Sequence, residues 1–524
     1  MRRRPLLLSM AAALAAPHVA CAESQRTLRF VPQADPAILD PIVTTGLVTR
    51  NHGFLIFDTL YGVDEQFRPQ PQMVAGHMME PNGLRWTMTL RDGLRFHDGI
   101  PVLARDVVAS LKRWGARDTF AASLFAVVDD LSASDDKTIV WRLKSPFPLL
   151  PDCLGKLGSS NAFIMPERLA KTDPFTALKE IVGSGPFRFD NADYVPGSRT
   201  VYERFADYHS RTEPTSLLAG AKIAHFDRVE WQTIPDPATA SAALQRGEVD
   251  WVEQPLVDLL PQLRRDRNLK VEVTDPTGAV AVMRFNQLHP PFDNPEIRRI
   301  VLGAVDQTEF MRAVVGDDWS LWKTPCGFFP PGAPMANDEG MSALTGPRNV
   351  PAAAKALRAG GYDGAPVTMM APTDFPAIQA MSEVTRDLLT KLGMNVDYLA
   401  MDWGSDLRRM INKNVPSKGG YNLFCSYSPG ITQYTPAAHT FLRGTGDKGP
   451  FGWSSSPELE HLRDQWLVAP DDAARLSIAK QMQRQAFIDV PYVPLGLFFQ
   501  PTAYKTDLVD IIQGPPLFWR VRRA

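Results

Sequence analysis

The segment of residues 84–114 most constrains the fold, because its hydrophobic period changes twice within a short stretch. Polar and apolar residues alternate over 85–91, as in a half-buried strand, and Asp-Gly at 92–93 is typical of a hairpin turn. A second short strand is expected at 94–96, and residues 97–99 break it. Apolar residues then recur at helical spacing up to the end of the segment. The sequence therefore predicts strand, turn, strand, turn and helix.

Helices and strands also alternate farther along the chain. An apolar helix face runs over 378–392, Gly393 is placed to cap it, and 395–399 is expected to be the next strand. Asn-Pro at 294–295 is an N-cap and first-turn proline, and it precedes an apolar face up to 305. A third helix is predicted from 471 to about 488, before extended chain. These patterns predict an α/β protein with mixed sheets.

The N-terminus has the features of an export signal. Residues 2–4 are arginines, 6–16 form an apolar run too short to span a bilayer, and 20–22 form a small-x-small cleavage site. We expect residues 1–22 to be a signal peptide, so that the mature chain begins near Glu23 in the periplasm. The arginines also loosely fit a twin-arginine signal, and Cys21 loosely fits a lipoprotein site.

Composition excludes several classes of protein. The full chain carries a net charge of −2, and removal of the signal makes it more negative, which does not favour nucleic acid or an anionic membrane as partner. Cys153, Cys326 and Cys425 would remain, so at most one disulfide can form, and its pairing cannot be deduced from the sequence. Because they lack CxxC spacing and the histidines lack HxxxH spacing, no metal site is expected.

Seven short motifs, or groups of motifs, follow one another along the chain in an order that is informative. They are Leu-Asp-Pro at 39–41, Phe-Asp-Thr-Leu-Tyr at 57–61, Phe-His-Asp-Gly at 96–99, Gly-Ser-Gly-Pro at 183–186, Glu-Arg-Phe-Ala-Asp-Tyr at 203–208, Ala-Leu-Gln-Arg-Gly-Glu-Val-Asp at 243–250, and Arg-Phe-Asn at 284–286 followed by Pro-Pro-Phe-Asp-Asn at 290–294. We expect the segments 84–114 and 181–208 to lie far apart in space. In order and spacing, the whole set resembles the extracellular solute-binding proteins of the peptide/nickel type, family 5, which deliver ligands to ABC importers.

The resemblance implies an α/β fold of the type II periplasmic binding protein kind, with two lobes, hinge strands and a small extra domain. Lobe one would comprise 23–60, 182–280 and 500–524, the extra domain 61–181, and lobe two 281–499. Ligand would bind in the cleft between the lobes, and closure would present a different surface to the ABC permease. We expect a monomer that needs no cofactor.

The sequence offers little for catalysis. Gly-x-Gly-x-x-Gly at 444–449 follows no convincing strand and precedes Pro450, so a dinucleotide site is not expected. Ser184 lacks the Gly-x-Ser-x-Gly elbow of hydrolases. His97 is more simply a turn-stabilising residue than a ligand or base, and we predict that the protein is not an enzyme.

Ligand contacts are predicted from the family's usual ligand-reading segment and from aromatic residues in loop-like contexts. The predicted set is Thr45, Asn286, Trp403, Phe424, Tyr427 and Ser428. Core packing is at least as good an explanation for each aromatic residue of the set.

One departure from the family pattern bears on the ligand. The peptide-binding branch usually has Gly-Trp-x-x-Asp where this chain has residues 422–430, and that aspartate holds the peptide's ammonium group. Here Tyr427 or Ser428 stands in its place. A buried ammonium without a carboxylate is unfavourable, which points to a ligand without a free amine. The alternative is that another acid, Asp402 or Asp406, reaches the same point.

The sequence thus favours the periplasmic component of an ABC importer that captures a peptide or peptide-like solute. A related receptor or chaperone-like protein without a transport role is the alternative. An exported hydrolase would need a catalytic geometry that the sequence does not offer.

Overall fold

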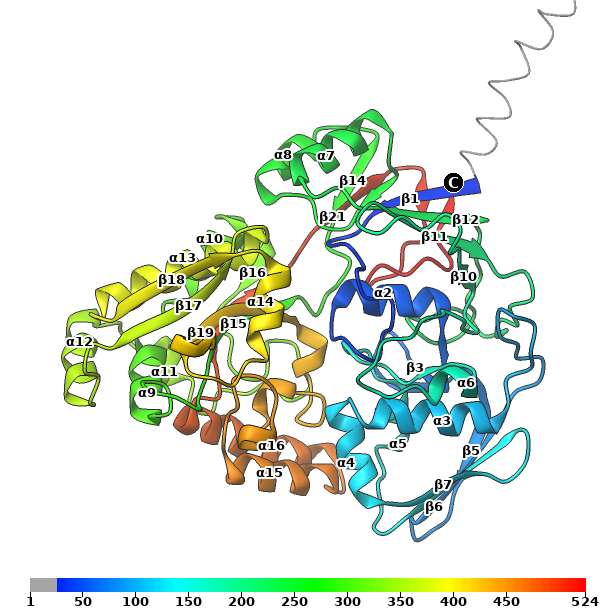
Figure 1. The fold of residues 1–524 in the computed structure, drawn as a ribbon, viewed down its shortest axis with the longest axis horizontal. Coiled ribbons are helices and arrows are strands. Elements are labelled where there is room, and N and C mark those ends of the chain that lie inside the picture. The colour runs from blue at the N-terminus through cyan, green and yellow to red at the C-terminus, as the bar shows by residue number, and fades with distance from the viewer. Residues whose placement is uncertain (1–25) are drawn as a thin grey trace, which may run out of the picture. The chain divides into compact units, whose positions relative to one another are not determined.

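The computed structural model describes residues 26–524, so the predicted signal peptide and Cys21 lie outside the described residues. The chain forms two compact units (Figure 1). Unit 1 runs up to Asp275 and resumes at Pro501–Ala524, and unit 2 is Pro276–Gln500, so the chain passes between the units twice. The boundaries predicted at 280/281 and 499/500 lie close to these positions, and the extra domain predicted at 61–181 stays a prediction.

Unit 1 is built on a mixed seven-stranded sheet. Its strands, in spatial order, are β10 Phe187–Phe189, β11 Arg199–Arg204, β12 Arg228–Gln232, β1 Thr27–Val31, β13 Trp251–Val252, β21 Thr502–Lys505 and β14 Leu269–Glu272. β1 is parallel to both of its neighbours, and the other pairs are antiparallel. On β1, the ring of Phe30 contacts Trp251 (5.2 Å between centroids) and Phe518 (5.1 Å). This aromatic core fixes the C-terminal segment against the sheet.

A second, four-stranded antiparallel sheet of unit 1 comprises β5 Val74–Met79, β6 Arg85–Leu90, β8 Thr138–Leu143 and β7 Val128–Ala133. The remaining strands of the unit are β2 Asp58–Thr59, β3 Tyr61–Val63, β4 Pro69–Pro71, β9 Phe163–Ile164, β22 Leu508–Val509 and β23 Arg522–Arg523. Its helices are α2 Leu47–Ile56, α3 Ala104–Gly115, α4 Thr119–Val127, α5 Leu150–Gly155, α6 Glu167–Ala170, α7 Pro237–Arg246 and α8 Leu260–Leu263, with a short 3-10 turn at Val257–Leu259.

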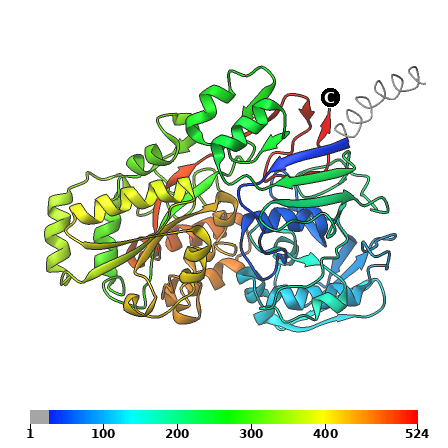
Figure 2. The same ribbon diagram turned by 45° about the horizontal axis from the view of Figure 1, so that its top comes forward.

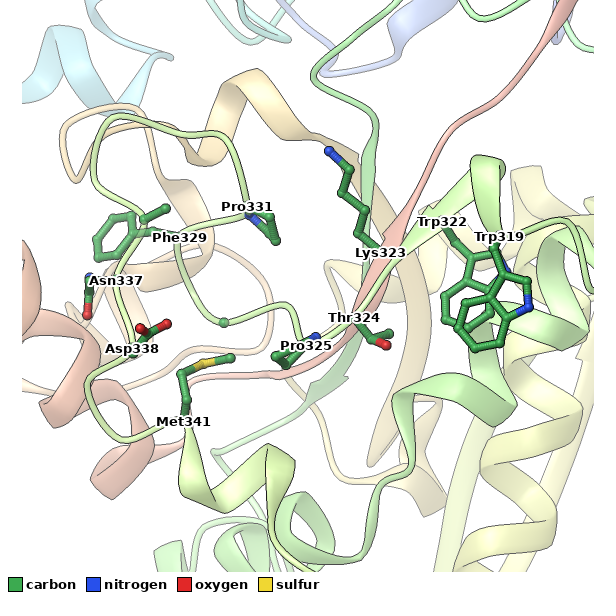
Figure 3. A pocket seen from close by; sticks show the side chains of 12 residues that line it. Trp319, Trp322, Lys323, Thr324, Pro325, Phe329, Pro331, Asn337, Asp338 and Met341 are labelled. Atoms are coloured by element: carbon green, nitrogen blue, oxygen red, sulfur yellow. The ribbon is translucent and has the colours of Figure 1, made fainter.

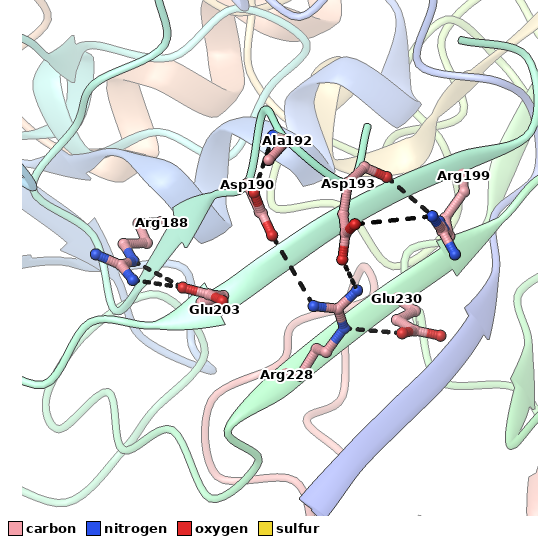
Figure 4. Close-up of polar contacts among 8 residues, drawn as sticks. All are labelled: Arg188, Asp190, Ala192, Asp193, Arg199, Glu203, Arg228 and Glu230. Carbon is pink, nitrogen blue, oxygen red and sulfur yellow. Dashed lines mark hydrogen bonds and ion pairs between the residues drawn. The ribbon is translucent and has the colours of Figure 1, made fainter. Parts of the chain in front are cut away.

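Charged side chains on β10, β11 and β12 of the seven-stranded sheet form ion pairs (Figure 4). On β12, the Arg228 guanidinium lies 2.8 Å from Glu230 and also pairs with Asp193. Arg188 on β10 pairs with Glu203 on β11. These groups are partly exposed, so the network contributes little to stability.

Unit 2 is built on a mixed six-stranded sheet. Its strands, in spatial order, are β16 Trp322–Lys323, β20 Val493–Phe498, β15 Ala279–Phe285, β19 Leu423–Pro429, β17 Pro366–Pro372 and β18 Asn395–Met401. Its helices are α9 Pro295–Ala304, α10 Gln307–Val315, α11 Ser342–Thr345, α12 Val350–Ala359, α13 Pro376–Lys391, α14 Trp403–Met410, α15 Pro457–Leu467 and α16 Asp472–Asp489. Short 3-10 turns lie at Trp319–Leu321, Pro416–Lys418, Gly430–Gln433, Thr440–Leu442 and Gly446–Lys448.

Helices α13 and α14 pack on opposite faces of this sheet (Figure 2). On β19, Cys425 lies on the α13 face, where its thiol is 3.1 Å from the hydroxyl of Thr385. Phe424, which precedes Cys425 in the chain, lies on the other face of the sheet and packs with Met410 of α14. This alternation along β19 decides which predicted ligand residues face which helix.

Several predictions are confirmed in unit 2. The helix α13 ends where Gly393 adopts a positive φ of 85°, and β18 follows directly. Asn294 caps α9, because its side chain accepts the N–H of Glu296 at 2.9 Å. The third predicted helix is α16, and β20 follows it. Cys153, Cys326 and Cys425 are buried and free, so no disulfide joins them.

The segment 84–114 corrects two expectations. β6 and α3 are present, but residues 94–96 form no strand, only an isolated bridge between Arg95 and Pro101. The partners of β6 are β5, which directly precedes it in the chain, and β8, which comes from a more distant part of the chain. The expectation that 84–114 and 181–208 lie far apart was wrong, because His97 bonds Gly183 and Gly185 directly.

Candidate functional site

Three aromatic rings gather at one edge of the sheet of unit 2. β17 is parallel to β18 and to β19, so their carboxyl ends meet at the same edge. Phe375 follows β17, Trp403 follows β18, and Tyr427 lies near the end of β19. The Phe375 ring centroid is 5.5 Å from that of Trp403 and 5.9 Å from that of Tyr427. We call these rings, with Asp374 and Asp406, the strand-end cluster. Open α/β sheets commonly bind ligands at this edge.

All three rings are only partly buried. Tyr427 also meets Phe498 of β20 edge-on, with the centroids 5.4 Å apart. A half-buried ring held from behind by another ring is rigid, and it leaves one side available for an apolar or cationic group.

Helix α14 begins inside the strand-end cluster. Asp402 is its N-cap, and its carboxylate accepts the N–H of Ser405 at 2.9 Å and the Ser405 hydroxyl at 2.5 Å. Asp374 accepts the backbone N–H of Trp403 at 2.7 Å, which ties the start of α14 to the end of β17. Asp402 is therefore occupied by helix capping.

Asp406, one turn into α14, is in an unusual state. Its side chain is fully buried, and neither carboxyl oxygen has a hydrogen-bond partner among residues 26–524. Burial, with the nearby charge of Asp374, raises the pKa of Asp406 to about 7. It shares the inner face of α14 with Trp403 and Met410, which pack against an apolar cluster containing Met370 and Phe424.

The structure places the predicted ligand residues in different settings. Trp403 and Tyr427 come together in the strand-end cluster. The Ser428 hydroxyl, next along β19, lies 2.7 Å from the Thr432 hydroxyl. Thr45 is exposed in unit 1, just before α2.

Phe424 and Asn286 have packing and bonding roles of their own. Phe424 is 1% exposed within the apolar cluster under α14. The Asn286 amide donates to the carbonyl of Tyr421 at 2.9 Å, and its oxygen accepts the N–H of Leu288 at 3.1 Å, so it joins the ends of β15 and β19. Ligand contact by either residue stays a prediction.

Sequence reasoning missed Phe375 and Asp374. Both lie between the end of β17 and Pro376, the first residue of α13. One sequence signal could have found them. A polar residue and an aromatic residue follow a buried strand and directly precede a proline that starts a helix.

A hollow of about 460 Å³ lies elsewhere in unit 2 (Figure 3). On one side, the rings of Trp319 and Trp322 stack with centroids 4.2 Å apart, and Trp319 is 62% exposed. The hollow is lined by Trp319, Trp322, Lys323, Thr324, Pro325, Gly327, Phe329, Pro331, Ala336, Asn337, Asp338 and Met341. Trp322 is 2% exposed, and its ring packs against that of Trp319. A smaller hollow of about 350 Å³ in unit 1 lies beside Lys222.

The residues considered for catalysis have structural explanations. A Cβ at Gly183 would lie 2.0 Å from the carbonyl oxygen of Ile56. Gly183 and Gly185 therefore allow the chain to pass close to the end of α2. Ser184 between them is buried. Within residues 26–524 no group of three His, Cys, Asp or Glu side chains could hold a metal ion. In the same part of the chain, no helix combines the length and apolarity needed to cross a bilayer.

The sequence profile of the bacterial extracellular solute-binding proteins, family 5, matches residues 68–452. The chain belongs to this family. A probable peptide ABC transporter periplasmic-binding protein, y4tO of Sinorhizobium fredii, is 34% identical over 525 residues, with 99% of this chain and 98% of the relative covered.

Solved structures of other binding proteins agree in fold. The binding protein AgaA of A. tumefaciens R10, in complex with agropinic acid, superimposes with a TM-score of 0.80 over 95% of this chain and 99% of that chain, at 23% identity. A dipeptide-binding protein of Pseudoalteromonas sp. SM9913 with bound Met-Leu gives 0.77, at 18% identity, over 95% of this chain and 100% of that chain. The chain thus has the α/β two-lobed fold of type II periplasmic binding proteins, and family-5 proteins are solute-binding components of ABC importers.

Proposed function

We propose that this protein captures a peptide or peptide-like solute in the periplasm and delivers it, chemically unchanged, to the permease of an ABC importer. The observation that carries the proposal is the strand-end cluster, where Phe375, Trp403 and Tyr427 present half-buried rings at the carboxyl edge of a sheet. Rings of this kind provide large contact area at small entropic cost. The relative from S. fredii, a probable peptide ABC transporter periplasmic-binding protein, supports the class of ligand.

Capture would work through closure of the two units around the ligand. The chain passes between the units at 275/276 and at 500/501, which suits a hinge that moves without unfolding either unit. Unit 2 would contribute the strand-end cluster, and unit 1 would contribute Thr45 as a further ligand contact. Closure then creates the surface that the permease recognises.

We propose further that the protein is exported by its signal peptide, acts as a monomer, binds no nucleic acid and catalyses no reaction. The buried setting of Ser184 and the turn role of His97 support binding without chemistry. A receptor or chaperone-like protein of the same family is the alternative function.

A transport assay distinguishes the importer component from the receptor or chaperone-like protein. Cells that carry the chain with its cognate permease and ATPase subunits should accumulate radiolabelled dipeptide, and cells that lack only this chain should not. Equal uptake in both strains, together with dipeptide binding by the purified protein, would favour the receptor. Protection of an unfolded client from aggregation, without dipeptide binding, would favour the chaperone-like role.

A further inference from the structure

One tryptophan of this chain differs from the rest in its exposure. Of the 11 tryptophans, all but Trp319 and Trp403 are at most 3% exposed, whereas Trp319 is 62% exposed. The ring of Trp319 stacks on that of Trp322, with the centroids 4.2 Å apart and the planes at 29°. Arg312 lies 5.8 Å from the Trp319 centroid, near the limit of a cation–π contact, and is itself exposed. A flat apolar ring is thus fixed in place with much of its surface in water, which favours stacking with a ligand.

The hollow beside Trp319 has the size of a small-molecule site. Its volume of about 460 Å³ lies within the usual range for ligand pockets, about 300–1,000 Å³. Figure 3 shows the two stacked indoles on one side of the hollow and Phe329 on the other, with Pro325 and Met341 between them. An aromatic group that enters the hollow would therefore meet aromatic and aliphatic surface.

Two buried glutamine side chains fix the walls of the hollow. Gln307 donates to the carbonyl of Cys326 and accepts the N–H of the same residue, both at 2.9 Å. Gln483 accepts the N–H of Phe329 at 3.4 Å and donates to the side-chain oxygen of Asn337 at 2.9 Å. Because these bonds lie within unit 2 itself, the walls form without a ligand, which lowers the ordering cost of binding.

The rim of the hollow carries charges of both signs. Lys323 and Asp338 line the hollow and are exposed, and neither forms an ion pair within residues 26–524. The ammonium group of Lys323 lies 5.3 Å from the centroid of the Phe499 ring. Unpaired charges of both signs beside apolar rings fit a peptide, which has charged termini and a polar main chain, better than a hydrocarbon.

The hollow and the strand-end cluster lie along the same edge of one sheet. Trp322 on β16 pairs with Phe498 on β20. Phe498 pairs with Ala279, and Ala279 with Pro429, so one row of residues crosses four strands. Directly paired residues point to the same face of a sheet, and Tyr427, two residues before Pro429, points there too. The rings of Tyr427 and Phe498 are accordingly in contact. The aromatic side chains of the two places therefore share one face of the sheet.

We propose that the hollow beside Trp319 is a second ligand subsite, which binds an aromatic side chain of a peptide whose other end occupies the strand-end cluster. Three strand spacings of about 4.8 Å separate β16 from β19, roughly 14 Å in total, and an extended peptide advances about 3.3 Å per residue. A dipeptide then fills only one of the two subsites, and a peptide of about five residues spans both. This proposal rests on the proposed function and narrows the ligand to extended peptides with aromatic residues near both ends.

The experiment measures, by calorimetric titration, the affinities of the peptides Phe-(Ala)n-Phe, with n from zero to four. The references are the two peptides of the same length that carry a single phenylalanine at one end or the other. We expect the second phenylalanine to tighten binding roughly tenfold when n is three or four, and to have a much smaller effect when n is zero. Trp319→Ala should abolish this gain, and Trp319→Phe, which keeps a ring, should retain part of it. The matched control Ile488→Ala removes an exposed apolar side chain elsewhere in unit 2 and should leave the gain unchanged.

Fluorescence gives a second readout of the same site. Acrylamide quenches exposed tryptophans, so Phe-(Ala)3-Phe should protect the parent protein from quenching more than pentaalanine does, and this difference should be lost in Trp319→Phe. If no peptide of the series binds, the proposed function itself fails, and the subsite fails with it. If peptides bind but the second phenylalanine has the same effect at every length, only the subsite is overturned. A gain in long peptides that persists in Trp319→Ala would also overturn it, because another surface would then bind the second ring.

Discussion

His97 and Gly183 are joined by two hydrogen bonds. The backbone N–H of His97 donates to the Gly183 carbonyl at 2.9 Å, and the Gly183 N–H donates to Nδ1 of His97 at 3.3 Å. Nε2 of the same ring donates to the Gly185 carbonyl at 3.1 Å. Because Nδ1 accepts and Nε2 donates, the ring is neutral, which agrees with a pKa lowered by burial to about 4.

Replacement of His97 should destabilise unit 1. His97→Ala removes the partner of a buried N–H and of a carbonyl, at a cost of about 1–3 kcal/mol in the free energy of unfolding. Denaturant unfolding measures this change, with the exposed His225→Ala as control. Equal stability of the two variants would mean that the hydrogen bonds of the His97 ring contribute nothing to the free energy of unfolding.

Acid should weaken the fold through buried neutral histidines. Burial lowers the pKa of His97 to about 4, and those of His52 and His439 to about 3. Unfolded histidine binds its proton near pH 6.5, so the unfolded state takes up more protons and stability falls as pH drops from about 6.5 towards 4. Melting temperature against pH checks this, and His97→Gln should show a shallower decline. If melting temperature falls equally steeply with pH in the parent and in His97→Gln, His97 is not a buried neutral histidine that weakens the fold in acid.

The Arg113–Asp40 pair should be essential to unit 1. It links α3 to the Leu-Asp-Pro motif, and both side chains are at most 1% exposed. Arg113→Met leaves Asp40 buried without its counter-charge, which we expect to cost about 3–5 kcal/mol in the free energy of unfolding. The control is Arg188→Met, which breaks an exposed pair and should cost less than about 1 kcal/mol. Similar losses in both variants would show that burial of the pair is unimportant.

Neighbouring residues of β19 should separate binding from packing. Tyr427→Ala should weaken ligand binding by about 1–3 kcal/mol, roughly 5- to 150-fold, with little change in melting temperature, because its ring is only half-buried. Phe424→Ala empties the apolar cluster under α14 and should cost about 3–5 kcal/mol of stability. Calorimetry and thermal melting of both variants check this. A Tyr427→Ala protein that binds normally but melts early would place that ring in the core.

Asp406 should make the empty protein less stable as pH rises. Its folded pKa of about 7 lies above the ordinary value of 3.8, so the native state binds the proton more tightly than the unfolded state. Stability is then highest below about pH 4 with respect to this group and falls as pH rises to about 7. Asp406→Asn should be more stable than the parent at pH 8, by on the order of 1–4 kcal/mol, with the difference vanishing near pH 4. A constant difference across this range would contradict a buried, mostly neutral Asp406.

Local patterns predicted the helices and strands whose signals lie within one element. The Asn294 cap of α9 and Gly393 after α13 are examples, because capping depends on residues a few positions apart. The pairing of β6 with β8, and the contact of His97 with Gly183, join segments far apart in sequence, and no local period reports such contacts.

The candidate site was predictable only in part. Trp403 and Tyr427 could be chosen as rings in unusual contexts, but the shared carboxyl edge that adds Phe375 depends on the strand order. The isolation of Asp406 depends on where every neighbouring donor points, which the spacing of residues in α14 does not reveal.

Calorimetric titration of the purified mature protein with dipeptides, followed by mass analysis of the recovered ligand, tests the central claim most directly. Binding without chemistry predicts one dipeptide bound per chain and full recovery of that dipeptide unchanged. Absence of binding across the dipeptide set, or recovery of cleaved products, would contradict it.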